Sequence, residues 1–496
     1  METIKVILWG HEVGRLTWDK RRRNSYFTLN PDFKKLGLDI APLTMPMGSP
    51  RVDFPQYGQE GKLYQSLPPF IADSLPDAWG NELFDLWRIQ NHLPLANITP
   101  LEKLSFIGQR GMGALEFEPV IERGMLSGKV DMQALFDLAK KIAIDHENAV
   151  IRPDENLTLE SLIQVGTSAG GRQPKAIIAI DQTTGEIRSG QIAGLSGYKY
   201  HILKFGDPDR STAELEMTYC QMATEAGIAM SPSQLMLIEG CAHFLTERFD
   251  RPNGTKMHMQ TLAALAPEAD SYEALMHTCR KLGFNDQTIE EVYRRMVFNI
   301  LSNNTDDHNK NFAFLMDEQG RWHLAPAYDM TFIFDLGGYT PNPNHCLRAR
   351  GKLSGHTYTD LIEMAEDNGI RNAEAIIKRV ADTLNTFRTK AIANGLALCW
   401  MGRIEHALNQ NLRHFGLLPS LPQVAFELDG HRVSNVLVEP AYKGAYHLFA
   451  SIDGQDRKFI FTKKMEEYHL IDTIGIDNLS PSDFKRLISQ DKDFMS

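Results

Sequence analysis

A run of polar residues between an apolar helix and an apolar strand constrains this sequence more than any other feature. Residues 303–311 read Asn-Asn-Thr-Asp-Asp-His-Asn-Lys-Asn, after the apolar helical pattern of residues 292–301 and before the apolar residues 312–315. A solvated loop does not explain two carboxylates, an imidazole, an ammonium group and several amides between two buried elements. We therefore interpret residues 303–311 as a functional loop.

The spacing within this loop indicates phosphoryl transfer. Asp306 and Asn311 are five positions apart, the spacing found in protein-kinase catalytic loops. In such loops the carboxylate accepts the proton of the substrate hydroxyl, and the amide oxygen holds Mg²⁺. A hairpin predicted over residues 312–324 would return Asp329 to the mouth of the loop. A carboxylate there suits Mg²⁺, whereas Asp329 taken alone would indicate only a helix or turn cap.

A glycine-rich stretch could supply the phosphate contacts of a nucleotide site. Residues 165–175 provide cations and backbone N–H groups ahead of a strand predicted at 176–180. The stretch is not a Walker A loop, and a flexible hairpin explains it about equally well when it is taken alone.

A lysine and a glutamate downstream fit the same interpretation. Lys204 ends an alternating strand, where it would be an inward-facing charge that needs a partner. Ser211 and Glu214 form a capping-box signature that predicts a helix containing Glu216. A strand lysine oriented by a helix glutamate grips the ATP phosphates in kinases. A surface lysine at a strand end is the alternative.

The composition narrows the classes of protein that fit. The 496 residues are about three times a typical domain length, so two or three domains are expected. The 52 basic and 63 acidic side chains leave a net charge of -11, which opposes sequence-independent binding to nucleic acid. We exclude a protein that binds nucleic acid on its own.

Nothing in the sequence predicts a membrane span or a signal peptide, so cytoplasmic residence is expected. The cysteines are widely spaced and include no C-x-x-C pair, which favours reduced, buried thiols over disulfides or a zinc ribbon. They are Cys220, Cys241, Cys279, Cys346 and Cys399.

The chain divides into four predicted parts. Residues 1–135 begin with a β meander and include a helix at 75–90. A second helix is predicted at 132–146, and strands follow it within the part that spans residues 136–250. Residues 251–418 are mainly helical. Residues 419–496 form a separate module of hairpins, with Asp-Gly turns at 429–430 and 453–454. A strand at 242–249 enters a charged turn between the second and third parts. This turn is either a hinge that would contact adenine or a strand end with exposed charges.

Taken in order, the segments resemble the HipA family of bacterial serine/threonine kinases, the toxins of two-gene toxin–antitoxin modules. The resemblance covers about residues 1–417 and implies an α+β, two-lobed protein-kinase-like fold with a β-rich N-terminal subdomain. The module at 419–496 departs from the family's usual ending. The matching motifs are Leu75-Pro76-Asp77-Ala78-Trp79-Gly80, Gly111-Met112-Gly113, Gly166–Gly171, Glu247–Arg251, Asn304–Asn311 and Tyr328-Asp329.

The resemblance also implies roles for single residues. Asp306 would be the catalytic base, Asn311 and Asp329 would hold Mg²⁺, and Lys204, partnered by Glu216, would contact the ATP phosphates. Further contacts to ATP are implied for Thr167, Ser168, Ala169, Gly170 and Gly171 in the phosphate loop, Glu247 and Phe249 at adenine, Asp250 near the ribose, and His308 and Lys310 in the catalytic loop. Some members autophosphorylate a serine in the phosphate loop; the candidates here are Thr167 and Ser168.

The expected function is therefore that of an ATP- and Mg²⁺-dependent protein serine/threonine kinase. The family implies a helix-turn-helix antitoxin partner similar to HipB, DNA binding through that complex, and in some members an aminoacyl-tRNA synthetase as substrate. Two alternatives stay open. One is a metal-dependent phosphohydrolase that uses Asp306, Asp307, His308 and Asp329, and the other is a catalytically silent pseudokinase.

Overall fold

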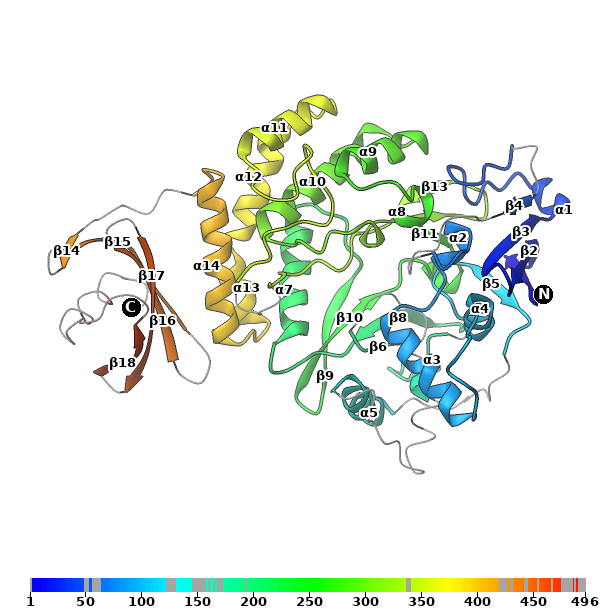
Figure 1. Ribbon diagram of the computed structural model, residues 1–496, viewed down its shortest axis with the longest axis horizontal. Helices are drawn as coiled ribbons and strands as arrows, with labels where there is room; N and C mark the ends of the chain where they lie inside the picture. The colour runs from blue at the N-terminus through cyan, green and yellow to red at the C-terminus, as the bar shows by residue number, and fades with distance from the viewer. Residues whose placement is uncertain are drawn as a thin grey trace.

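The computed structural model describes residues 2–48, 53–55, 64–121, 131–144, 158, 161–163, 166, 173–191, 194–335, 340–418, 426–428, 431–440, 445–452, 455–464, 467–473, 485 and 488. In this part of the chain the strands form four antiparallel sheets, with helices beside them (Figure 1). Among the described residues, no helix is long and apolar enough to cross a membrane.

The first sheet contains the predicted N-terminal meander. Ile4, Val6 and Leu8 occupy alternate positions of one strand, and their side chains are buried against short helices. The strand order is β4 (Asp53–Pro55), β3 (Asn24–Leu29), β2 (His11–Asp19), β1 (Glu2–Leu8) and β5 (Leu115–Glu118). The helices are α1 (Pro31–Lys34), α2 (Pro69–Ala72) and α4 (Pro100–Ile107).

The second sheet is covered on its two faces by different helices. Its strands are, in spatial order, β7 (Ile187–Ser189), β6 (Lys175–Asp181), β8 (Tyr198–Lys204), β10 (Cys241–Glu247) and β9 (Ser233–Ile238). The helices α3 (Ala78–Gln90) and α5 (Met132–Ile144), both predicted from apolar periodicity, pack on Ile178, Leu203 and Leu245. The opposite face carries Lys204 and Phe244, and there Phe244 packs against α7 (Thr212–Glu225).

The start of α7 corrects one detail of the sequence analysis. The helix begins at the predicted position, but Ser211 has a left-handed backbone and its side chain caps nothing in α7. Its hydroxyl instead accepts a hydrogen bond from the Ala397 N–H at 3.4 Å. The predicted capping box is therefore wrong, because a contact from a distant helix replaces the local one.

A third sheet and most of the helices share one large core. The sheet has the order β11 (His258–Thr261), β12 (Ala313–Met316) and β13 (Trp322–Leu324), which includes the predicted hairpin. Two 3₁₀ turns, η2 (Pro252–Gly254) and η3 (Asn309–Asn311), precede β11 and β12, respectively. The helices are α8 (Leu262–Leu265), α9 (Tyr272–Lys281), α10 (Asp286–Ser302), α11 (Tyr358–Asp367), α12 (Ala373–Leu384), α13 (Phe387–Ala393) and α14 (Leu398–His414).

The fourth sheet is a meander at the opposite end of the molecule from the first (Figure 1). Leu428 pairs with His431 and Ile452 pairs with Gln455, as expected for the two predicted Asp-Gly hairpins. The turn residues 429–430 and 453–454 themselves lie outside the described residues. The strands are β14 (Phe426–Leu428), β15 (His431–Pro440), β16 (Ala445–Ile452), β17 (Gln455–Lys464) and β18 (Glu467–Thr473).

The cysteines are all free, as predicted, but not all are buried. Cys220 and Cys279 lie in the core, whereas Cys346 is exposed. The expectation of buried thiols is wrong for Cys346 because residues 345–347 alternate like a strand, with His345 and Leu347 inward and Cys346 outward.

Candidate functional site

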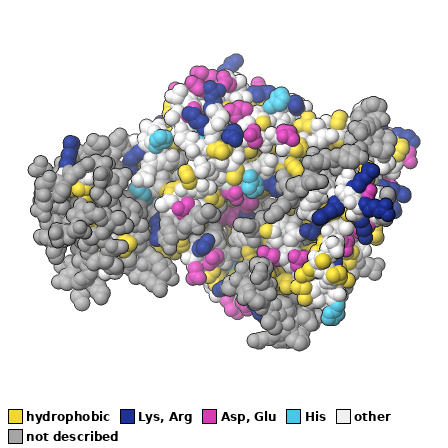
Figure 2. All heavy atoms as spheres, in the orientation of Figure 1, with side chains coloured by type: hydrophobic (Ala, Val, Ile, Leu, Met, Phe, Trp, Pro, Cys, Tyr) yellow, Lys and Arg dark blue, Asp and Glu magenta, His cyan; other side chains and the backbone are white. Residues whose placement is uncertain are grey.

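A cavity of about 670 Å³ lies where the second sheet meets the helical part of the chain. Its walls come from the segment before α3, from the second sheet with α7, and from the loop 306–311 with residues 327–331. In Figure 2, acidic side chains are visible in a hollow near the middle of this face. Nine of the predicted site residues line the cavity: Lys204, Glu216, Glu247, Phe249, Asp306, His308, Lys310, Asn311 and Asp329.

The polar loop is held in place by buried amides. α10 ends at Asn303, whose positive φ of 56° turns the chain out of the helix. Asn304 then donates from its side chain to Asn299 Oδ1 at 2.9 Å, and Asn299 donates to the Tyr272 hydroxyl at 2.9 Å. This network fixes the start of the loop relative to α9 and α10, so the next side chains have defined positions.

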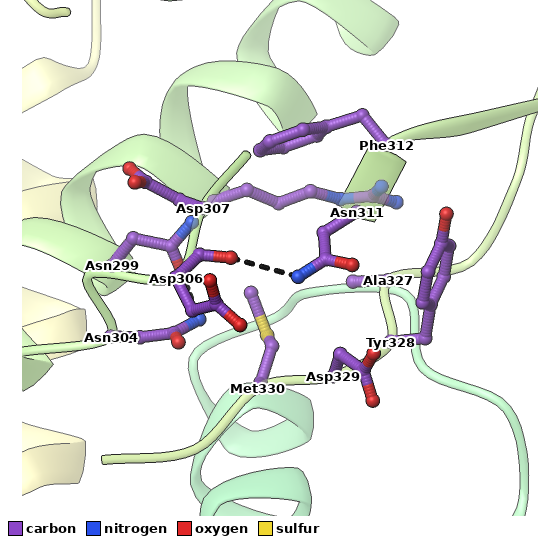
Figure 3. A pocket seen from close by; sticks show the side chains of 11 residues that line it. Asn299, Asn304, Asp306, Asp307, Asn311, Phe312, Ala327, Tyr328, Asp329 and Met330 are labelled. Atoms are coloured by element: carbon purple, nitrogen blue, oxygen red, sulfur yellow. Dashed lines mark hydrogen bonds between the residues drawn. The ribbon is translucent and has the colours of Figure 1, made fainter. Parts of the chain in front are cut away.

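Asn311 is oriented by the backbone of the residue proposed as catalytic base. Its Nδ2 donates to the carbonyl oxygen of Asp306 at 2.8 Å (Figure 3). This hydrogen bond leaves the amide oxygen of Asn311 available as a metal ligand. Asn311, Asp306 and Asp329 line the same small cavity at the end of the loop. An amide oxygen and a carboxylate are a donor set that suits Mg²⁺, which completes its shell with water and phosphate oxygens.

Asp306 and Asp307 are neighbours with opposite environments. The Asp306 side chain is 54% exposed, and its Oδ1 lies 3.9 Å from His308 Nε2. Burial and the nearby carboxylates raise the pKa of Asp306, and His308 lowers it by less. A partly exposed carboxylate with a raised pKa can accept a proton from a bound hydroxyl group.

The Asp307 carboxylate is fully buried and acts as a structural acceptor. It receives hydrogen bonds from the Tyr272 hydroxyl at 2.6 Å, His345 Nδ1 at 2.9 Å and the Cys346 N–H at 2.7 Å. The donors come from α9 and from the segment that follows the third sheet. Asp307 therefore ties that segment to the loop and has little capacity left for a metal ion.

Lys204 is held between two carboxylates at the inner end of the cavity. Its Nζ lies 2.5 Å from Glu216 Oε1 and also contacts Asp329 Oδ1. Burial lowers the pKa of Lys204, but Asp329 and Glu216 raise it by more, so the ammonium group stays charged. Asp329 has a positive φ of 54°, and its pKa is held below its usual range by Lys204 and Lys175 despite burial. The predicted lysine–glutamate pair is thus formed, and the hairpin brings Asp329 to it.

The far end of the cavity is formed by residues 247–249, where β10 ends, three positions along that strand from the residue paired with Lys204. Glu247 accepts a hydrogen bond from Lys199 Nζ at 2.6 Å, and the Phe249 ring lies 5.7 Å from that of Tyr328. This end contains two aromatic rings, which suit a flat heterocycle.

Asp250 does not line the cavity, contrary to the position near the ribose that the sequence analysis expects. Its carboxylate is completely buried and accepts from Arg248 Nε at 2.9 Å, Arg251 Nη1 at 2.7 Å and the Gly113 N–H at 2.7 Å. Arg251 also donates to the Gly111 carbonyl at 2.9 Å. Burial raises the pKa of Asp250, but Arg248 and Arg251 lower it well below its usual range. Asp250 thus fastens residues 111–113 to the second sheet.

The predicted phosphate-loop residues Thr167, Ser168, Ala169, Gly170 and Gly171 lie outside the described residues. Both flanks are described. Gly166 lies against α3, and Lys175 begins β6 directly opposite Lys204.

Two family models match this sequence. One, the HipA N-terminal domain, matches residues 4–118. The other, the HipA-like C-terminal domain, matches residues 167–387. Together the two matches span more than half of the chain. The chain belongs to the HipA family. Residues 388–496, which include the fourth sheet, lie outside both matches.

Comparison with solved structures confirms the fold class expected for a HipA-family chain. HipA from Shewanella oneidensis MR-1, solved with HipB and operator DNA, has a TM-score of 0.58 at 15% identity, over 83% of this chain and 96% of that chain. The two-lobed, α+β, protein-kinase-like fold is therefore established. The proinflammatory kinase CtkA from Helicobacter pylori gives a TM-score of 0.34 at 14% identity, over 44% and 88%, too low to support an argument. No curated protein matches the sequence.

Four charged residues of this HipA-family chain line the cavity without having been predicted as site residues: Asp73, Asp77, Lys175 and Arg248. Asp73 accepts from the Thr261 N–H at 2.6 Å and from its hydroxyl at 2.8 Å. The sequence held a signal for each of the others. Lys175 ends the glycine-rich stretch, Asp77 belongs to the Leu75–Gly80 motif, and Arg248 belongs to the Glu247–Arg251 motif.

Proposed function

We propose that this HipA-family protein is an ATP- and Mg²⁺-dependent protein serine/threonine kinase. The observation that carries the proposal is the arrangement of one cavity. Lys204 and Asp329 meet at its inner end beside the Asp306–Asn311 loop, and residues 247–249 form its far end. The same set serves nucleotide binding and hydroxyl activation in protein kinases.

Each side chain has a defined task in this mechanism. Lys204, oriented by Glu216, would bind the ATP phosphates, and His308 and Lys310 would add positive charge. Asn311 and Asp329 would hold Mg²⁺, which neutralises charge on the phosphates when it is bound. Asp306 would accept the proton of a serine or threonine hydroxyl. Catalysis would consist mainly of positioning and charge stabilisation.

The ends of the cavity support a matching orientation for ATP. Glu247 and Phe249 would contact adenine beside Tyr328, so that the phosphates extend toward Lys204. The segment with Thr167 and Ser168 would cover the phosphates, and one of these two hydroxyls would be the autophosphorylation site.

The phosphohydrolase alternative is less well supported. It would need Asp307 as a metal ligand, but the Asp307 carboxylate is occupied by three close donors. Among the described residues, no group of three or more His, Cys, Asp or Glu side chains could hold a metal ion. Magnesium held by Asn311, Asp329 and phosphate oxygens needs no such group.

The variant Asp306→Asn tests the proposal. We expect phosphate transfer to fall about 100- to 10,000-fold because the proton acceptor is lost, while ATP binding persists. Intact-mass spectrometry of the full chain and phosphoproteomics of a lysate, both after incubation with Mg-ATP, would measure the transfer. Asp286→Asn is the matched control, because Asp286 is an exposed acid at the other end of α10.

Two results would contradict the proposal. If the native chain binds ATP but phosphorylates neither itself nor any lysate protein, the pseudokinase alternative is favoured. If it releases phosphate from ATP or esters without a protein acceptor, the phosphohydrolase alternative is favoured.

The proposal extends to partners by analogy with the family. The Shewanella oneidensis HipA was solved with HipB and operator DNA. We infer a helix-turn-helix, HipB-like antitoxin for this chain, DNA binding through that complex, and action in the cytoplasm on a cellular protein such as an aminoacyl-tRNA synthetase. The same phosphoproteomic comparison of native and Asp306→Asn chains would identify the substrate.

A further inference from the structure

The N-terminal part of the chain reaches the cavity through the start of α3. Asp77 caps this helix, and its Oδ1 accepts the Gly80 N–H at 2.8 Å. Leu75, Asp77 and Ala78 line the cavity. Because α3 also packs on the face of the second sheet opposite α7, it links the N-terminal part to the sheet that carries Lys204.

The same helix holds both ends of the segment between Gly166 and Lys175. Trp79 Nε1 donates to the Lys175 carbonyl at 3.1 Å. A Cβ atom on Gly166 would lie 2.6 Å from Leu83 Cδ1 and 3.1 Å from Trp79 Nε1. Only glycine fits this contact without displacement, so Gly166 is closely packed against the helix.

Lys175 is a second buried lysine in the cavity. It is directly opposite Lys204 in the register of β6 and β8, and only 2% of its surface is exposed. Its Nζ lies 3.9 Å from Asp77 Oδ2, a buried oxygen that accepts no hydrogen bond from a described residue. Buried lysines are rare without an opposite charge.

The electrostatics agree with this pairing. Burial raises the pKa of Asp77 to about 6, and Lys175 opposes that rise more than any other group. Burial lowers the pKa of Lys175, and Asp77 is the strongest influence in the other direction. Each charge therefore opposes the effect of burial on the pKa of the other.

We propose that Asp77 is a positioning residue that holds Lys175 charged and aimed at the phosphates of bound ATP, opposite Lys204. This inference rests on the proposed function, because it assumes that ATP occupies the cavity. It makes α3 part of the phosphate-binding machinery. The N-terminal part then contributes to ATP affinity without a catalytic residue of its own.

The test is the affinity of the full chain for Mg-ATP and for adenosine, measured by titration calorimetry. Asp77→Asn keeps the helix cap, since asparagine caps as well as aspartate. We expect it to weaken Mg-ATP binding roughly tenfold and to leave adenosine binding unchanged. Lys175→Met should weaken Mg-ATP binding similarly, and the double variant should be no weaker than Lys175→Met alone.

Asp131→Asn is the matched control. Asp131 accepts the Ala134 N–H at 3.1 Å at the start of α5, is exposed and does not line the cavity. If Asp77→Asn does not fold, Asp77→Ser, which also caps, replaces it.

Several outcomes would overturn the inference. Unchanged or tighter Mg-ATP binding in Asp77→Asn would mean that Asp77 only repels the phosphates or caps the helix. Additive losses in the double variant would mean that the two side chains act separately. If the native chain binds adenosine and ATP equally or binds neither, the proposed function itself is contradicted. That result is distinguishable from failure of the Asp77 inference, because it is seen in the native chain and not only in the variants.

Discussion

Asp250 is fully buried and Lys204 is largely buried, and each lies between two side chains of opposite charge. Asp250 faces Arg248 and Arg251 and is sealed from the cavity. Lys204, with its carboxylate partners, lines the cavity. The first cluster closes on itself and joins parts of the chain, whereas the second is open to a ligand.

The difference shows that burial and opposite charge alone do not identify a functional site. A closed cluster recovers its desolvation cost only through its own hydrogen bonds, so every member is needed. In an open cluster, a bound ligand can replace one of the partners. Access to the cavity is therefore the property that separates the two clusters, and two measurements would test this distinction.

The largest effect is expected in the closed cluster. Asp250→Ala would leave two buried guanidinium groups without their carboxylate and release residues 111–113. We expect a loss of about 3–5 kcal/mol in the free energy of unfolding, measured by urea denaturation. A loss below about 1 kcal/mol would mean that the cluster is dispensable for stability.

A smaller change in stability but a large one in activity is expected for the open cluster. Lys204→Met leaves Glu216 and Asp329 adjacent, and one of them can take up a proton. We expect stability to change by less than about 2 kcal/mol, while phosphate transfer falls roughly 100-fold. On the same sample, urea denaturation would measure the free energy of unfolding, and intact-mass assays would measure phosphate transfer. Equal destabilisation by Lys204→Met and Asp250→Ala would contradict the distinction.

A third type of buried group has no charged partner and should respond to pH. His243 is fully buried and its Nδ1 accepts the Gly206 N–H at 2.9 Å, so the ring must be neutral. Burial lowers its pKa to about 4. In the unfolded chain, His243 takes up a proton near pH 6.5. Its contribution to the free energy of unfolding is therefore lost as the pH falls from about 6.5 to 4.

His243→Gln would isolate this contribution. Between pH 7 and pH 5.5 the native chain should lose about 1.2 kcal/mol more than the variant, measured by urea denaturation at both pH values. An identical pH dependence of the two proteins would show that His243 does not titrate in this way.

The loop 303–311 and the return of Asp329 could be predicted because both are local. The polar residues lie between two apolar elements and are followed directly by a hairpin. The contacts among them therefore form within one short stretch of sequence. The pairing of Lys204 with Glu216 was predictable for the same reason, since only twelve positions separate them.

Contacts between distant parts of the chain could not be predicted in this way. Asp77 and Lys175 meet only because α3 packs on the second sheet, and no spacing in the sequence encodes that contact. Asp250 follows the strand that leads into the cavity, but two adjacent arginines turn its carboxylate away. The prediction of a cap at Ser211 was wrong for the same reason, because the Ser211 hydroxyl accepts a hydrogen bond from the Ala397 N–H at the start of another helix, α14.

The bond between the Gly113 N–H and Asp250 also has a consequence for biosynthesis, because 137 residues separate the two partners. At about 5–20 residues per second, the ribosome needs roughly 7 to 27 s to make that stretch. During this interval the first sheet can pair, but residues 111–113 have not yet met the carboxylate that holds them. The fourth sheet pairs only neighbouring strands, so its contacts are local and can form almost as soon as it is made. The N-terminal part therefore completes its folding only after the middle of the chain has been made, whereas the strand pairing of the fourth sheet depends only on residues within that sheet.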